Sequence, residues 1–259
     1  MLITILIATL SPVAATAAET TAFVGATVMP VAGPPVEDGV LVIRDGKIAR
    51  IGKNLNAPAG VEEIDATGMH VMPGIIDAHS HIAIDAVNEA TNPVTAEVAV
   101  GDALDPLDIS IYRALAGGVT ASHAMHGSAN AIGGQCETIK HRYGTYDPND
   151  LVMEGAPRTI KFALGENPMR VHGEGYNLVP RTRMGVEQVF RRAFSDAQTH
   201  MKAWEKYEKE KNSNPKALAP RYDRRLETLA DILRGDIIIH CHSYRADEIL
   251  MLMNVLEDF

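Results

Sequence analysis

The sequence is poor in cysteine, in basic residues and in long apolar segments. Its two cysteines, Cys136 and Cys241, lie far apart in the chain, and each falls beside candidate active-site residues. A structural disulfide is therefore not expected, although an exported protein could carry one, and we interpret both thiols as small buried side chains. Acidic residues outnumber basic ones by 33 to 24, which gives a net charge of −9. This balance argues against a nucleic-acid partner, because phosphates require a basic surface.

Long apolar segments are missing apart from one at the N-terminus. The run Met1–Leu10 is too short for a permanent transmembrane helix, and the small residues that follow include Ala15-Thr16-Ala17, which fits the cleavage rule for signal peptides. We interpret residues 1–18 as a signal peptide, which predicts an exported, periplasmic or secreted protein without a stable membrane anchor. No Lys or Arg precedes the run, so the alternative is an apolar tail that has no fold.

The remaining composition is that of a globular protein, with 46% hydrophobic and 22% charged residues in a chain of 259. Residues 19–72 show a strand-and-turn pattern. Two alternating runs, Gly39–Arg44 and Lys47–Gly52, flank the dipeptide Asp45-Gly46, which is a strong signal for a β-hairpin. The pattern predicts a first domain of β-strands over residues 19–72.

The most informative segment is Val71–His81, in which an apolar run ends in His79 and His81. Residues two apart in an extended chain point to the same side, so both imidazoles can reach one point at the carboxyl end of a strand. Pro73-Gly74 marks the entry into that strand. This spacing suits a metal ion, and the alternative is a strand end with two surface histidines.

The segment Pro73–His81 resembles the strand-1 motif of the amidohydrolase superfamily, whose members are metal-dependent hydrolases built on a (β/α)8 barrel. Further segments follow in the order of that family, and they are most similar to the branch with imidazolonepropionase-like enzymes and metal-dependent Xaa-Pro dipeptidases: Gly117–Thr120, Gly127–Gln135, Ile160–Gly165 and Ile237–His242. The resemblance implies that residues 19–72 form part of a small β-sandwich. It also implies that residues 73–259 form the N-terminal part of the barrel.

Strand-like and helix-like segments alternate after residue 73, which predicts an α/β fold with a parallel sheet. We expect strands in Val71–Ile76, Val119–His123, Glu137–Arg142, Thr159–Leu164 and Ile237–His240. We expect helices in Pro106–Ala116, Val186–Lys211, Tyr222–Arg234 and Asp247–Phe259. Five strands are fewer than the eight of a closed barrel, which takes about 250 residues alone. The sequence is therefore interpreted as a partial TIM-like (β/α)8 barrel, truncated after the fifth strand.

Lys161 lies in the otherwise apolar run Thr159–Gly165, which predicts a lysine in a buried strand. A buried ammonium is costly unless it is paired or neutralised. The resemblance implies that Lys161 reacts with carbon dioxide to give a carbamate, which acts as a bridging metal ligand. The alternatives are a lysine that reaches solvent or one that pairs with Glu166. Glu166 is also the replacement ligand from this strand if Lys161 does not serve.

His240 follows three isoleucines and closes a strand expected to be fully buried. The resemblance makes it the strand-5 metal ligand and gives His242, two residues further, a role near the substrate. His126 and Gln135 are weaker candidates for pocket residues. Other histidines and arginines have no support beyond an ordinary structural or surface role: His123, His141, His172, Arg158, Arg170 and Arg181.

The implied metal ligands are His79, His81, Lys161 and His240, and the implied catalytic residues are Lys161 and His242. Nitrogen and carbamate donors suit one or two divalent ions, with zinc favoured. Such a site activates hydroxide for attack on a carbonyl carbon, so the expected function is hydrolysis of an amide, peptide or cyclic amide. We expect a small-molecule or dipeptide substrate, and homo-oligomer formation is left open.

The family's strand-6 histidine and strand-8 aspartate have no counterpart in these 259 residues. The chain as it stands is therefore expected to be an inactive fragment of an amidohydrolase. The alternative is a short, non-catalytic binding protein that retains half of the fold. Within the enzyme class, deacetylation of an acetamido sugar and cyclic-amide hydrolysis both stay open.

Overall fold

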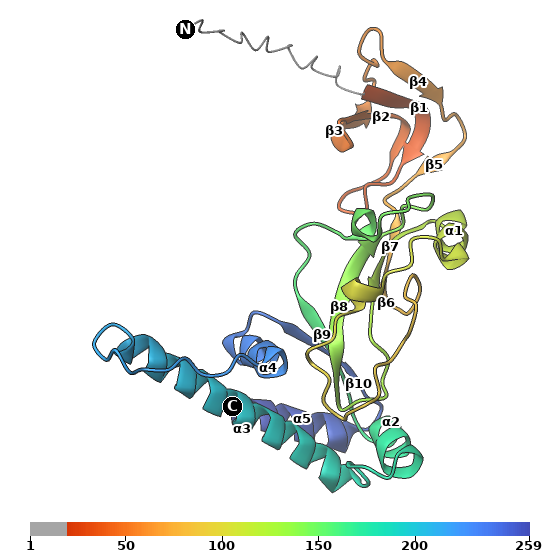
Figure 1. Cartoon of the computed structure of the whole chain (residues 1–259). Helices are drawn as coiled ribbons and strands as arrows, with labels where there is room; N and C mark the ends of the chain where they lie inside the picture. Colours follow the sequence, from red (N-terminus) through yellow and green to blue (C-terminus); the bar gives the residue numbers. More distant parts are fainter. Residues whose placement is uncertain (1–19) are drawn as a thin grey trace, which may run out of the picture. The chain divides into compact units, whose positions relative to one another are not determined.

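The computed structural model describes residues 20–259, so the predicted signal peptide, residues 1–18, lies outside the described part. The chain divides into two compact units, of which the first ends at Pro73 and the second is Gly74–Phe259. Both units are drawn in Figure 1, coloured along the sequence. None of the helices found between residues 20 and 259 has the length and apolar character needed to cross a membrane.

The first unit is one five-stranded sheet in which β1 pairs with β2, β4 and β5, and β3 pairs with β2. Its strands are β1 (Thr20–Val28), β2 (Val36–Arg44), β3 (Lys47–Lys53), β4 (Glu62–Asp65) and β5 (His70–Val71). Asp45 and Gly46, both with positive φ, join β2 to β3, as the predicted hairpin requires. Both faces of the sheet carry apolar clusters, one around Leu41 and one around Val42. This unit is the predicted part of a β-sandwich.

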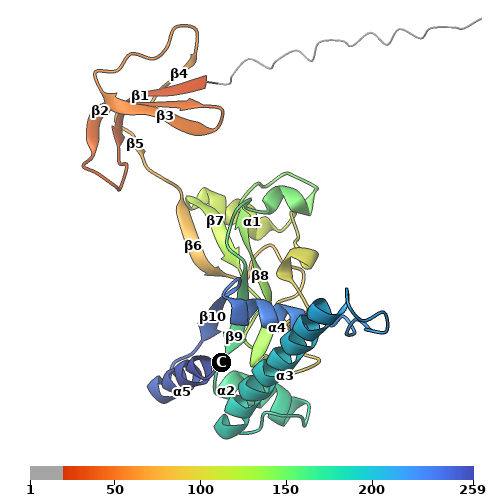
Figure 2. The same ribbon diagram turned by 90° about the vertical axis from the view of Figure 1, so that its left-hand side faces the viewer.

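The second unit contains a five-stranded sheet of order β10-β9-β8-β7-β6 (Figure 2). Its strands are β6 (Ile75–Ser80), β7 (Val119–Ala124), β8 (Ile132–Lys140), β9 (Thr159–Ala163) and β10 (Ile238–His242). The pairs β6–β7 and β9–β10 are parallel. The predicted α/β partial barrel of five strands is therefore confirmed.

Strand β8 departs from the expected parallel sheet, because it runs antiparallel to both β7 and β9. It also begins at Ile132, earlier than the expected Glu137. The reason lies in the connection: only residues 125–131 join β7 to β8, whereas a parallel crossover needs about a dozen residues or more. So short a connection can only return the chain in the opposite direction.

The two edge strands differ from expectation in their burial. The sequence predicts buried runs before His79 and before His240, but Ile75 and Ile76 are 49% and 65% exposed, and Ile238 is 52% exposed. Strands β6 and β10 each have a neighbour on one side only. Apolar side chains on an edge strand lack half of the contacts that would cover them, and the sequence pattern does not reveal this.

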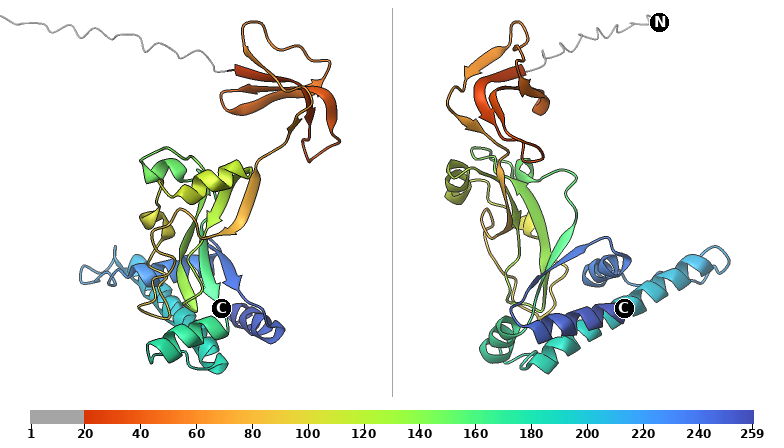
Figure 3. Two further views of the ribbon diagram at one scale, coloured as in Figure 1. Left: turned by 90° about the vertical axis from the view of Figure 1, so that its right-hand side faces the viewer. Right: turned by 180° about the vertical axis from the view of Figure 1, so that it is seen from behind.

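Six helical segments accompany this sheet: α1 (Ile109–Ala116), α2 (Glu166–Pro168), the π-helix η3 (Met169–Gly175), α3 (Arg183–Glu210), α4 (Arg224–Arg234) and α5 (Ala246–Glu257). Side chains of Asp108, Thr182 and Asp223 cap the first turns of α1, α3 and α4. Helices α3 and α5 lie side by side in both views of Figure 3. Two 3-10 turns, η1 (Val100–Ala103) and η2 (Pro148–Leu151), lie in the loops.

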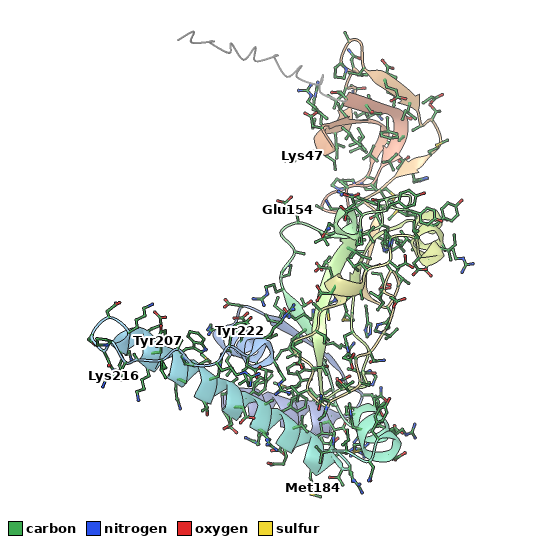
Figure 4. The ribbon with its side chains drawn as sticks, viewed as in Figure 1. Lys47, Glu154, Met184, Tyr207, Lys216 and Tyr222 are labelled. Atoms are coloured by element: carbon green, nitrogen blue, oxygen red, sulfur yellow. The ribbon has the colours of Figure 1, made fainter. Side chains whose placement is uncertain are left out.

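The main core of the second unit lies between the sheet and helices α3, α4 and α5. Phe162 of β9 packs against Phe190 and Phe194 of α3, and all three side chains are fully buried. A smaller cluster packs Ile111 of α1 on Ile139 of β8. The long helix α3 begins near Met184, and its far end carries Tyr207 and the loop with Lys216, which leads to Tyr222 and α4 (Figure 4).

Candidate metal centre

Lys161 occupies the middle of β9, where every residue is buried. Its neighbours Ile160 and Phe162 pack into the helix-side core, so alternation along the strand turns Lys161 to the opposite face. The side chain is 2% exposed, as the apolar run predicts. Its Nζ lies 3.2 Å from His79 Nε2, and no ion pair joins it to any residue of 20–259. Burial lowers the pKa of this amine.

The two alternatives for Lys161, a route to solvent or a pair with Glu166, are both contradicted. Glu166 begins α2 beyond the strand and accepts a hydrogen bond of 2.7 Å from Tyr244 Oη. It also forms an ion pair with Arg170. These two partners lower the pKa of the Glu166 carboxyl, with the Tyr244 bond as the larger cause. Glu166 therefore belongs to the rim of the site.

His79 and His81 close β6 with ring centroids 5.3 Å apart and ring planes at 83°. His81 Nδ1 donates a hydrogen bond of 2.8 Å to the carbonyl oxygen of Met125, which leaves Nε2 with a free lone pair. Histidine ligands of metals are commonly oriented by such a bond to the other ring nitrogen. Desolvation, followed by the charge of Lys161, lowers the pKa of His79.

His240 stands beside Lys161 in the parallel register of β9 and β10. Its ring is 4.4 Å from the ring of His123, with the planes tilted by 52°. Burial lowers its pKa, with a smaller contribution from Lys161. The register places its side chain on the same face of the sheet as Lys161. His240 therefore joins Lys161 and the histidines of β6 in one group of side chains, which we call the cluster.

His242 lies on the same face of β10, two residues beyond His240. Its Nε2 is 3.3 Å from Asn167 Nδ2, which also donates a bond of 2.7 Å to Ser128 Oγ. The Tyr244 ring meets the His242 ring edge-on at 5.6 Å. Burial and then Lys161 lower the pKa of His242. The residue sits between the cluster and the rim formed by Tyr244 and Glu166.

His123 is the member of this cluster that the sequence interpretation missed. Besides its contact with His240, its Nε2 lies 2.7 Å from Thr159 Oγ1, and it hydrogen-bonds to the backbone of Ala78. It thus contacts β6, β9 and β10 from β7. A signal was available, because His123 stands near the end of its strand as His79 does in β6.

The other candidate residues from the sequence have structural partners outside the cluster. His126 Nε2 accepts a bond from the Glu89 backbone, and its Nδ1 donates to Gly127, so this residue anchors a loop. His141 is bound in the same way by Ser122 and Val119. The remaining residues have partners away from the cluster or are buried elsewhere: Gln135 and Arg158 with each other, Arg170 with Glu166, Arg181 with Asn177, and His172 in the π-helix.

The cluster is rich in nitrogen and lacks an acid. Burial lowers the pKa values of His79, His123, Lys161, His240 and His242, which favours neutral forms with the lone pairs that metal binding needs. Across residues 20–259, no group of three or more His, Cys, Asp or Glu side chains is placed to hold a metal. The histidines by themselves are therefore not arranged as a ligand set, and the group at the centre of the cluster is the amine of Lys161.

Comparison with known proteins gives three informative similarities, although no family model matches the chain. The amidohydrolase tasK of Hapsidospora irregularis is 30% identical over 244 residues, which are 85% of this chain and 25% of tasK. The crystal structure of an amidohydrolase from Thermotoga maritima MSB8 is 36% identical, with a TM-score of 0.84, over 92% of this chain and 62% of that chain. The imidazolonepropionase of Thermoanaerobacter pseudethanolicus is 45% identical over 47 residues, 18% of this chain and 11% of that protein. The chain thus spans less than two thirds of each of these relatives.

Proposed function

Because the chain belongs to the amidohydrolase superfamily, we propose that it carries the metal-holding side chains of a hydrolase acting on carbon–nitrogen bonds. The observation that carries this proposal is Lys161, a buried amine without an acidic partner, 3.2 Å from His79 Nε2 and in register with His240. An ammonium at this place would be costly. A carbamate formed on Nζ would remove that cost and add the acid that the cluster lacks.

In this proposal His79, His81, Lys161 and His240 hold one or two divalent ions. Nitrogen donors with one oxygen donor suit zinc, and the bond from His81 Nδ1 to Met125 supports the fit because it presents Nε2. A divalent ion, when bound, supplies Lewis-acid polarisation of a carbonyl group and an acidified water. Lys161 contributes as the catalytic residue whose modification completes the ligand set.

The substrate side of the site is assigned to His242 and the rim. Asn167 holds the His242 ring from α2, so the imidazole is oriented to contact a bound carbonyl or amide. Tyr244 and the Glu166–Arg170 pair bound the opening beyond it. Similar proteins are named as a deaminase, a deacetylase, a dihydroorotase and a D-hydantoinase. We therefore propose a small amide, dipeptide or cyclic amide as substrate.

The test measures the modification and the metal before any turnover. The chain is purified with zinc and isotopically labelled bicarbonate, and carbamate is followed by carbon NMR while zinc is measured by elemental analysis. We expect a carbamate signal and bound zinc in the native chain, and loss of both in Lys161→Met, which keeps the apolar stem. Lys140→Met, which alters an exposed lysine of β8, is the matched control.

Activity is then measured on dipeptides, N-acetylated amines and lactams, with His242→Ala as a further variant. We expect His242→Ala to weaken substrate binding, which calorimetry measures without turnover, and to keep zinc close to the native amount. Full zinc occupancy in Lys161→Met would contradict the ligand role of Lys161. The coding sequence beyond the codon for Phe259 separates a hydrolase from a non-catalytic binding protein with this fold, because only the hydrolase needs a strand-6 histidine and a strand-8 aspartate.

Export is the remaining proposal, and it rests on the sequence of residues 1–18. Its support is the apolar run followed by Ala15-Thr16-Ala17. The N-terminus of protein recovered from the periplasm or the medium should begin close to Ala18. Recovery of the chain with Met1 intact inside the cell would contradict it.

A further inference from the structure

A cavity of about 330 Å³ lies in the helix layer of the second unit, between α3, α4 and the loop of residues 92–94. Its walls are mainly apolar: Val94, Val189, Ala193, Leu226 and Leu229. Leu229 and Ala193 are buried members of the core, and the other three pack against that core. The cavity is therefore a pocket formed by the fold itself, at the lower end of the size range of small-ligand sites.

This cavity is separate from the cluster around Lys161. Its walls belong to the core that covers Ile160 and Phe162, whereas Lys161 points to the other face of β9. None of the cluster residues lines the cavity. A ligand bound here would therefore not occupy the proposed metal centre.

Four polar residues line the cavity: Asn92, Arg192, Asp196 and Arg225. Arg225 of α4 is only partly exposed, yet no hydrogen bond or ion pair joins its guanidinium to any residue of 20–259. Arg192 of α3 also lines the cavity, and its ion pair with Asp196 is loose, at 4.0 Å. Arginines of two different helices thus line one mainly apolar space, and Asp196 is the single carboxylate of its lining.

We propose that this cavity binds a small monocarboxylic acid with an aliphatic or aromatic tail. The guanidinium fork of Arg225 matches a carboxylate in a bidentate pair, and no partner within residues 20–259 occupies it. The apolar walls take the tail and exclude a second charged group. Arg192 supplies further positive charge at the opening. The proposal concerns this cavity alone and does not depend on hydrolysis at the cluster.

The test is calorimetric titration of the full chain with octanoate, hexanoate and butanoate, and with octanamide as the neutral analogue. We expect saturable binding of octanoate at a single site, with each methylene added along the series raising affinity about fourfold. Octanamide should bind about tenfold more weakly, since it lacks the charge-assisted bonds to arginine. Arg225→Gln should weaken octanoate by about tenfold or more for the same reason.

Three variants separate this site from others. Arg221→Gln changes an exposed arginine outside the cavity, and octanoate affinity should be unchanged. Val189→Phe places a larger ring in the cavity wall and should abolish binding of octanoate. Lys161→Met must leave binding unchanged, because a carboxylate held at the metal centre would be lost with that residue.

The proposal is overturned by any of three results. These are octanoate binding that does not saturate, native octanoate affinity in Arg225→Gln, and octanamide affinity equal to that of octanoate. Circular dichroism of each variant confirms that the fold is retained. If Val189→Phe does not fold, Arg225→Gln and the octanamide comparison decide the question by themselves.

Discussion

The central strand β9 and the edge strands β6 and β10 all supply side chains to one cluster, but the strands differ in how deeply they are buried. Every residue of β9 is buried, whereas β6 is largely exposed and β10 only partly covered. Lys161 is therefore enclosed by the sheet and its surroundings. The edge histidines are held by a few local contacts: the rings of His79 and His81 meet, His81 also bonds to Met125 and His79 lies beside Lys161, and His240 contacts His123. The difference shows that the core positions the amine and that local contacts position the imidazoles.

The largest expected effect tests the packing difference between centre and edge. Phe162→Ala removes a fully buried ring that contacts Phe190 and Phe194, and it should lower the free energy of unfolding by about 3–5 kcal/mol. Ile76→Ala on the edge strand, where the side chain is 65% exposed, should change it by less than about 0.5 kcal/mol. Urea denaturation measures both, and similar losses would refute the distinction.

The second prediction concerns the end of the central strand. Gly165 has φ +64, and a Cβ there would lie 2.5 Å from Glu248 Oε2, a carboxylate that is itself buried and paired with Arg183. Gly165→Ala should therefore cost about 2–3 kcal/mol through strain and displacement of this pair. Gly235→Ala is the matched control, since Gly235 also has positive φ but nothing within 4 Å of the added Cβ.

The control variant Gly235→Ala should lower the free energy of unfolding by only about 1 kcal/mol, which is the cost of the left-handed backbone alone. Thermal or urea unfolding of both variants gives the comparison. Equal losses at the two positions would mean that Glu248 moves freely, and the description of a packed strand end would then be wrong.

The sequence predicted well those segments whose structure is decided by local pattern. The apolar run around Lys161 can only be a buried strand, and Asp45-Gly46 between alternating runs can only be a tight hairpin turn. The helical spacing around Phe190 likewise predicts α3 to within three residues at its start. In each case the residues that decide the structure are neighbours in sequence.

The edges could not be predicted in the same way, because their burial depends on which strands lie beside them. Ile76 and Ile238 have the apolar character of core residues, yet the sheet leaves them uncovered. Strand β8 runs antiparallel because residues 125–131 form too short a connection for a parallel crossover. The hydrophobic pattern of the sequence carries no information about strand direction. His123 was missed because its partners, Ala78, Thr159 and His240, all come from other strands.

The third prediction concerns the pH dependence of the hydrogen bond between His126 and the loop that contains Glu89. His126 must be neutral for its Nε2 to accept the Glu89 amide, and burial lowers its pKa below the ordinary histidine value of about 6.5. The unfolded chain therefore binds the proton first, so this stabilisation is present above about pH 6.5 and is lost as pH falls towards the lowered value.

We expect the free energy of unfolding to fall by on the order of 1 kcal/mol per such histidine between about pH 6.5 and 5.5. Replacement His126→Gln should flatten part of this dependence and speed hydrogen exchange of the Glu89 amide. His70→Gln, at an exposed position of the first unit, should leave the profile as it is. A native profile that is flat over this range would contradict the prediction.

The smallest change in stability, with the clearest consequence for the cluster, is expected from His123. This side chain links the centre to both edges, because it contacts Thr159 in β9, His240 in β10 and the backbone of Ala78 in β6. His123→Leu fills a similar volume and loses the hydrogen bonds to Thr159 and to the backbone of Ala78, so the free energy of unfolding should fall by on the order of 1 kcal/mol. Zinc affinity, measured by chelator competition, should fall at least about tenfold, since His240 and β6 lose a group that orients them.

His141→Leu is the matched control: His141 has two comparable bonds, to Ser122 and Val119, and contacts none of the proposed ligands. It should lose similar stability and keep native zinc affinity. Equal zinc affinity in the two variants would show that the edge histidines are oriented without His123, and that the centre supports them only through Lys161.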